Sequence, residues 1–192
     1  MDDPVYRTLR NIAIVLTLAW VGWSAWDSFF REKPPGSIEF QAGERFFEDG
    51  QYAEAVREFD RVLAIDPDNP HAISAKARSL MQLGRNAEAL ELYDEAIARA
   101  PEVAANYANR GILHDRMGQY ERAIRDYEKA IALDPEITEG PNWLTRFLRM
   151  ETERPPTIAD RAGYLREQLA KPESERVLRI PEEDEKQRSY KM

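Results

Sequence analysis

Cysteine is absent from the 192 residues of this chain. Its absence excludes a disulfide framework, a thiolate metal site, a cysteine nucleophile and a lipid anchor carried on cysteine. A surplus of basic residues is also absent, because 27 Lys and Arg residues face 35 Asp and Glu residues and give a net charge of -8. Proteins that bind nucleic acid need a basic surface to displace phosphate counterions. We therefore expect no nucleic-acid partner, and any attachment to a membrane must be made by the polypeptide itself.

The sequence also has few residues suited to catalysis. It contains two histidines, His71 and His114, and lacks both a Gly-rich phosphate loop and a G-x-S-x-G motif. The Asp and Glu residues show no spacing that assigns an acid and a base, and on amphipathic helices most of them are expected to face solvent. We expect His114 to be a buried or half-buried structural residue. The sequence predicts no enzyme activity, no metal, no cofactor and no small-molecule substrate.

One long apolar run is present, "NIAIVLTLAWVGWSAWDSFF", at residues 11–30. As a helix it would span roughly 30 Å, the thickness of the hydrocarbon core of a bilayer. A cleaved signal peptide and a buried helix of a soluble protein are the alternatives. Tryptophans surround the small residues Gly22 and Ser24 and there is no A-x-A site, which disfavours cleavage. Since the run is apolar on all sides, we predict an uncleaved transmembrane helix at residues 11–30, after a flank at residues 1–10.

Three tryptophans in this run, Trp20, Trp23 and Trp26, recur every three residues and therefore share one broad face of the helix. An aromatic belt at the membrane interface is one interpretation. Contact with another transmembrane helix is the other, and it explains better why Trp20 lies near the middle of the run. We name the three residues as a candidate face for a partner within the membrane.

The charges beside the run leave its orientation open, because Arg7 and Arg10 before it are matched by Arg31 and Lys33 after it. An N-terminal signal anchor usually leaves its N-terminus in the cytoplasm, so we expect the remaining chain on the outer side. Residues 31–37, "REKPPGS", contain consecutive prolines, which break a helix. They predict a short Pro-rich linker that keeps a soluble domain close to the membrane.

Beyond the linker, one pattern returns at an interval of 34 residues: "GQYAEAVREFDRVLAIDP" from Gly50, "GRNAEALELYDEAIARAP" from Gly84 and "GQYERAIRDYEKAIALDP" from Gly118. Each glycine is expected to close one helix at a positive φ and to turn the chain into a second helix. In that second helix, an alanine allows close approach to the first, an aromatic residue packs one turn later, and a proline ends the helix. The alanines are Ala55, Ala89 and Ala123, the aromatic residues are Phe59, Tyr93 and Tyr127, and the prolines are Pro67, Pro101 and Pro135. Val62, Ala96 and Ala130 extend the apolar stripe between the aromatic residue and the proline.

This pattern resembles the tetratricopeptide repeat (TPR), a 34-residue helix-turn-helix unit. The second copy departs from the family at Lys76, Ala77 and Asn86, without losing the register. The resemblance implies an all-α fold in which residues 38–136 form a TPR α-solenoid of three repeats, at residues 36–69, 70–103 and 104–137. The matching residues are Ala42, Gly43, Phe46, Gly50, Tyr52, Ala55, Phe59 and Pro67 in the first copy, and Tyr107, Gly111, Gly118, Tyr120, Ala123, Tyr127, Ala130 and Pro135 in the third.

After the repeats, residues 138–171 predict two helices that cap the apolar end of the stack. The first starts at Pro141, and the second starts at Thr157, with Asp160 in a variant of the capping box. Residues 172–192 form a charged tail with little periodicity, which we expect to be unordered unless a partner orders it. The apolar faces of the two helices are Trp143, Leu144, Phe147 and Leu148, and Ile158, Ala162, Leu165 and Leu169.

The resemblance also implies a concave groove along the first helices of the repeats, where TPR proteins usually hold a peptide or a partner helix. Its apolar pockets, framed by charges of both signs, suit an amphipathic segment. Packing between repeats is the alternative role of the same aromatic residues. The candidate groove residues are Phe40, Glu44, Phe47, Ser74, Arg78, Met81, Asn109, Ile112 and Arg116.

One function of the family is not expected here. TPR domains that grip the C-terminal carboxylate of heat-shock chaperones use Lys, Asn and Arg residues of successive first helices. The corresponding places hold Phe40, Glu44, Ala75, Ala105 and Asn109, so only one matching polar residue remains. We expect no chaperone-tail cochaperone.

The sequence thus predicts a single-span, membrane-anchored bacterial TPR protein of the inner membrane, with its repeats on the periplasmic side. We expect a protein–protein interaction scaffold that serves as an accessory subunit or assembly factor of a membrane protein complex, with integral membrane subunits as partners. Three alternatives remain: a periplasmic holdase-like chaperone for exported proteins, a soluble exported adaptor if the first segment is cleaved, and an uncharted enzyme that depends on His114.

Overall fold

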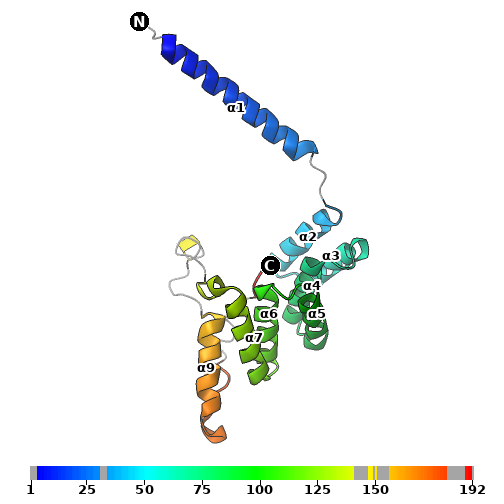
Figure 1. The fold of residues 1–192 in the computed structure, drawn as a ribbon. Coiled ribbons are helices and arrows are strands. Elements are labelled where there is room, and N and C mark those ends of the chain that lie inside the picture. The colour runs from blue at the N-terminus through cyan, green and yellow to red at the C-terminus, as the bar shows by residue number, and fades with distance from the viewer. Residues whose placement is uncertain are drawn as a thin grey trace. The chain divides into compact units, whose positions relative to one another are not determined.

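The computed structural model describes residues 4–30, 34–140, 147–148, 150, 156–180 and 189–191. The chain divides into two compact units, residues 1–34 and residues 35–192, and each is described by itself. Figure 1 shows a long helix in the first unit and paired helices in the second.

The first unit contains helix α1, Pro4–Phe30, which begins seven residues before the predicted span because Pro4 suits the first turn of a helix. Residues 4–26 are long and apolar enough to cross a membrane, and no part of their apolar window is buried. The hydroxyl of Thr17 donates a 2.8 Å hydrogen bond to the carbonyl of Ala13, so the helix itself satisfies this polar group. The length and apolar composition of α1 suit a membrane anchor or a signal sequence.

The second unit begins with three helix hairpins, as the 34-residue period predicts. Within each hairpin, the glycine at the turn has φ of 74°, a left-handed conformation that other residues rarely adopt. The first helices of successive hairpins contact one another, and so form one row along the stack. The hairpins are α2, Ser37–Glu48, with α3, Tyr52–Ile65; α4, Pro70–Gln82, with α5, Asn86–Arg99; and α6, Ala104–Arg116, with α7, Tyr120–Leu133.

The two helices of a hairpin approach closely where a glycine faces an aromatic ring. A Cβ atom on Gly43 would lie 2.6 Å from the ring of Phe59, and one on Gly111 would lie 2.7 Å from the ring of Tyr127. Both contacts leave no room for a larger residue. In the middle hairpin, Ala77 occupies the place of the glycine and is fully buried, so this departure from the family is accommodated in the core.

Beyond the hairpins lie the short 3-10 helix η1, Pro135–Thr138, and helix α9, Ile158–Ala170, which packs on α7. At the start of α9, Thr157 and Asp160 form the predicted reciprocal capping box. The helix predicted from Pro141 falls largely outside the described residues. A second 3-10 helix, η2, follows at Glu173–Glu175.

A buried ion pair joins α9 to the last hairpin. Arg161 donates two hydrogen bonds to the carboxylate of Asp115, at 2.7 and 2.9 Å, and these residues are only 7% and 4% exposed. The hydroxyl of Tyr127 also contacts this carboxylate, at 3.3 Å. The cap is therefore held to α6 by a bidentate charged contact as well as by its apolar face.

Parts of the tail pack against the helices, so the expectation of an unordered tail was wrong for residues 176–180 and 189–191. The backbone of Val177 hydrogen-bonds the side chain of Gln168, and Arg161 donates to the carbonyl of Leu178. Leu178 and Tyr190 are half-buried against the main apolar core. Burial of these apolar side chains, which the high charge of the tail obscures in its composition, orders the segment.

Candidate interaction surface

We use the name first-helix face for the nine predicted groove residues of α2, α4 and α6. Their exposure differs along the row. The three residues of α2, Phe40, Glu44 and Phe47, and the last residue of α6, Arg116, are half-buried. The other five, which are buried, are Ser74, Arg78, Met81, Asn109 and Ile112.

On the first-helix face, the structure brings Arg78 of α4 against two residues of α2. Its guanidinium forms an ion pair with Glu44 and lies over the ring of Phe47, at 4.2 Å from the ring centroid. Since Arg78 is 4% exposed, this cation is held by an anion and an aromatic face rather than by solvent. Met81 and Ile112 instead belong to the main apolar core.

The C-terminal segment lies on the same face, with Asn109 as its backbone partner. The Asn109 amide donates a 2.8 Å hydrogen bond to the carbonyl of Tyr190 and accepts a 2.7 Å hydrogen bond from its N–H. A single side chain thus pairs with both backbone groups of one residue. This contact requires an extended segment and does not depend on the side chain of the residue that is held.

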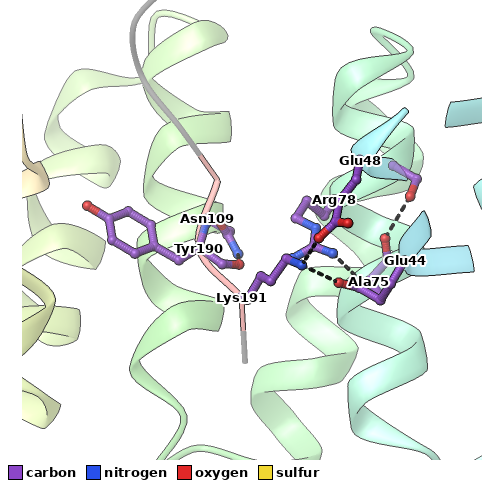
Figure 2. A network of polar contacts seen from close by, with 8 residues as sticks. Glu44, Glu48, Ala75, Arg78, Asn109, Tyr190 and Lys191 are labelled. Atoms are coloured by element: carbon purple, nitrogen blue, oxygen red, sulfur yellow. Dashed lines mark hydrogen bonds and ion pairs between the residues drawn. The ribbon is translucent and has the colours of Figure 1, made fainter. Parts of the chain in front are cut away.

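The next residue along the segment, Lys191, reaches α2. Its Nζ lies 2.6 Å from Glu48 and 3.1 Å from Glu44. Figure 2 shows Tyr190 and Lys191 pointing to opposite sides of the segment, with Lys191 between the carboxylates. The hydrogen bond from Lys191 lowers the pKa of Glu48, and the same bond raises the pKa of Lys191. Glu44 therefore bridges two cations, Arg78 and Lys191.

An open pocket of about 430 Å³ adjoins the segment. Tyr190 and Lys191 form part of its wall, together with the loop before α6 and residues that follow α7. The Tyr190 side chain is half-buried against the main apolar core, and this burial raises its pKa. The residues that line the rest of the pocket are Glu102, Val103, Ala104, Ala105, Asp134, Glu136 and Ile137.

The two histidines lie in different settings. His71 is exposed, whereas His114 is buried, with Nδ1 2.8 Å from the Gln119 side chain and Nε2 3.8 Å from Asp126. Burial lowers the pKa of His114, and this effect outweighs the opposite influence of Asp126. Among the described residues, no group of three His, Cys, Asp or Glu side chains is arranged to hold a metal ion. This arrangement suits a structural role for His114.

Sequence reasoning missed a charged contact that recurs between hairpins. Lys76 of α4 pairs with Asp60 of α3 at 2.6 Å, and Arg110 of α6 pairs with Asp94 of α5 at 2.7 Å. Arg110 also donates two hydrogen bonds to Asp126, at 2.7 and 2.8 Å. Asp60 and Asp94 are 34 residues apart, as are Lys76 and Arg110. This shared spacing could have predicted ion pairs that join successive repeats.

The contacts of Glu48, Tyr190 and Lys191 were missed as well. Their partners lie 81 and 143 positions away in the chain, and no local pattern connects them.

In the first unit, the three predicted tryptophans are exposed by 62% to 71%.

Comparison with known proteins agrees with this architecture. Residues 46–109 match one family model of the tetratricopeptide repeat, and residues 104–137 match a second. Residues 46–137 are tetratricopeptide repeats. TPR domains are in general modules for protein–protein interaction, and this scaffold is typically non-catalytic. A search of curated proteins found no match to the chain.

Solved structures of TPR domains are similar to this chain. The Sgt2 TPR domain from Aspergillus fumigatus is 20% identical with a TM-score of 0.54, over 73% of this chain and 87% of that one. MamA is 20% identical with a TM-score of 0.51, over 60% and 68%. The first TPR of Spaghetti (RPAP3), bound to the HSP90 peptide SRMEEVD, is 25% identical with a TM-score of 0.50, over 61% and 90%. The first two likenesses show the fold alone.

Proposed function

We propose that this protein is a membrane-anchored interaction scaffold that serves as an accessory subunit or assembly factor of a membrane protein complex. The observation that carries the proposal is the pairing of an exposed apolar helix, α1, with a TPR stack. A single tether would restrict the repeats to the membrane surface and so raise their effective concentration toward membrane proteins. Integral subunits of a complex in the bacterial inner membrane, met on the periplasmic side, are the proposed partners.

The three tryptophans of α1 support a second contact, inside the membrane. Trp20, Trp23 and Trp26 expose large side chains along one face of the helix. Packing against another transmembrane helix would cover this face. An interfacial belt would need the indoles near one end of the span only, so the two roles predict different effects of substitution.

The test is affinity purification of the full-length protein in mild detergent, followed by quantitative mass spectrometry. We expect one complex near stoichiometry, and a weaker yield when residues 10–31 are exchanged for an unrelated span. The variant W20L/W23L/W26L keeps an apolar helix and is expected to lose partners to a similar degree. Its matched control, I14L/L18I/V21L, alters the opposite face of the helix and should leave recovery unchanged.

Many weak partners that are indifferent to the span would contradict the proposal and would support a holdase-like chaperone. The intact mass of the purified protein tests the anchor itself. A mass that includes Met1–Trp26 agrees with an uncleaved span, whereas a mass that lacks it would indicate a processed, exported adaptor.

A further inference from the structure

The C-terminal segment, residues 189–191, lies on the first-helix face like a bound peptide. It is extended, and Asn109 pairs with both the N–H and the carbonyl of Tyr190. It crosses from α6 to α2, where Lys191 meets Glu44 and Glu48 (Figure 2). The chain itself therefore shows what kind of segment this face accepts.

Selectivity for such a segment arises from the residue that follows the one held by Asn109. The two amide hydrogen bonds are formed with backbone atoms, which every residue except proline offers. The next side chain enters a space between two carboxylates, and one of them, Glu44, also pairs with Arg78. When residues 189–191 leave, two carboxylates and one guanidinium remain, and the net charge of this group is negative.

A negative site favours a cation and disfavours an anion. The HSP90 peptide held by the first TPR of Spaghetti, SRMEEVD, is acidic near its end. At the first-helix face of this chain, Glu44 and Glu48 would repel such a sequence. A lysine or arginine at the place of Lys191 would meet both carboxylates, as Lys191 itself does.

The contacts of the segment are suited to release. Lys191 and Glu48 have side chains that are 55% and 61% exposed, and exposed ion pairs contribute little. Among the described residues, the other polar contacts of residues 189–191 with the first-helix face are the ion pair of Lys191 with Glu44 and the two hydrogen bonds of Asn109. Tyr190 also packs against the main apolar core. A competing segment with the same polar chemistry and an apolar side chain at this place can therefore replace the contacts of residues 189–191.

We propose that the first-helix face binds an extended segment of a partner protein in which a lysine or arginine follows the residue held by Asn109, and that residues 189–191 occupy this site until the partner displaces them. The inference rests on the proposed function, because it gives the chemistry of the partner that this scaffold recruits. The tail then competes with the partner for the same site. The apparent affinity of the partner is its intrinsic affinity multiplied by the fraction of sites that the tail leaves open.

The test measures binding of a fluorescent peptide with the sequence of residues 185–192, EKQRSYKM, to the full-length protein in mild detergent by fluorescence anisotropy. We expect the protein variant Lys191→Glu, whose own tail is released, to bind the peptide about three- to tenfold more tightly than the wild type does. In that background, the further change Asn109→Ala should weaken binding about tenfold, because two hydrogen bonds are lost.

A charge exchange tests selectivity. A peptide that carries K191E should bind the Lys191→Glu protein about fivefold more weakly than EKQRSYKM does. Adding Glu48→Lys to this protein should reverse the preference between the two peptides. The matched control is Glu54→Lys on α3, a partly exposed glutamate away from the first-helix face, which should leave the preference unchanged.

Equal affinity of the wild type and the Lys191→Glu protein would overturn self-occupancy, and a preference that ignores Glu48→Lys would overturn the basic specificity. A wild-type protein that dimerises with rising concentration, and a Lys191→Glu variant that does not, would assign the segment to a second copy and overturn displacement within one chain. The proposed function fails separately, if no membrane complex is recovered while the peptide results hold. Recovery of a complex without peptide selectivity removes only this inference.

Discussion

Among the charged contacts that hold C-terminal segments to the repeat stack, Asp115–Arg161 and Glu48–Lys191 differ in burial. Asp115 and Arg161, which fasten α9, are both more than nine-tenths buried. Lys191, which fastens the end of the chain, and its partner Glu48 are more than half exposed. The loss of one member of a buried pair leaves a charge without solvent, whereas the members of an exposed pair return to water. The Asp115–Arg161 contact is therefore needed for the stability of the fold, whereas the Glu48–Lys191 contact can open without unfolding it.

The largest effect is expected from Arg161→Met. The carboxylate of Asp115 would remain buried without its bidentate partner, at a cost of about 3–5 kcal/mol in the free energy of unfolding. Denaturant unfolding of the full-length protein in detergent, followed by circular dichroism, measures this loss. The double variant D115L/R161M removes both charges and should recover most of the stability. A small loss for Arg161→Met would erase the contrast between the two contacts.

The next effect, from Gly111→Ala, separates stability from binding. The added Cβ would meet the ring of Tyr127 at 2.7 Å, and such overpacking costs about 1–3 kcal/mol. Because Gly111 faces α7 rather than the tail, the affinity for EKQRSYKM should not change. The control is Ala77→Gly at the equivalent place in α4, which should cost about 1 kcal/mol through helix propensity and a lost methyl group. A change in peptide affinity for Gly111→Ala would show that the site depends on the packing of the hairpin.

A smaller effect is expected from Lys191→Glu on stability. The contacts of Lys191 with half-buried Glu44 and exposed Glu48 contribute little to stability, and they weaken as salt screens the charges. The unfolding midpoints of the variant and of the wild type should therefore differ slightly at low salt and converge at high salt. A loss comparable to that of Arg161→Met would place the tail within the cooperative fold.

The smallest effect is a pH dependence at His114. Burial lowers the pKa of this imidazole below its ordinary value of 6.5, so the unfolded chain takes up the proton first. The stability that His114 contributes is present above pH 6.5 and is lost as the pH falls through that value toward the lower pKa of the folded state. Over this range the unfolding midpoint of His114→Gln should fall less steeply than that of the wild type. If the unfolding midpoints of the wild type and of His114→Gln fell equally steeply with pH, the lowered pKa of His114 would be contradicted.

The repeats were predictable because their signals are local. A glycine at each turn, a small residue opposite a ring and a proline after the hairpin all lie within 34 residues, as for Gly111, Gly118, Tyr127 and Pro135. The same 34-residue period contains the ion pairs that join the hairpins, but by itself Lys76 indicates only a departure from the family pattern. The reason for a lysine at this usually apolar position is its ion pair with Asp60 in the preceding helix, α3.

The site on the first-helix face was predictable only in part. The nine residues were placed by resemblance, yet the role of Asn109 depends on a backbone 81 positions away and that of Glu48 on Lys191. Hydrogen bonds to backbone atoms do not depend on the sequence of the segment that is held, so no sequence pattern predicts them. Lys191 is one of several charged residues in the tail, and its sequence context does not distinguish it from the others. The high charge of the tail therefore predicted an unordered segment. Composition gives no indication that a few apolar side chains, Leu178 and Tyr190, pack against the core.

The recurring pairs Asp60–Lys76 and Asp94–Arg110 give the two joints between repeats the same charge pairing. Removal of residues 70–103, one whole period, would bring Asp60 opposite Arg110, an acid opposite a base as before. A duplication of the same segment would likewise create only joints of the same charge pattern. In this respect the stack is extensible, since a change of length by whole units keeps an acid of one hairpin opposite a base of the next at these positions.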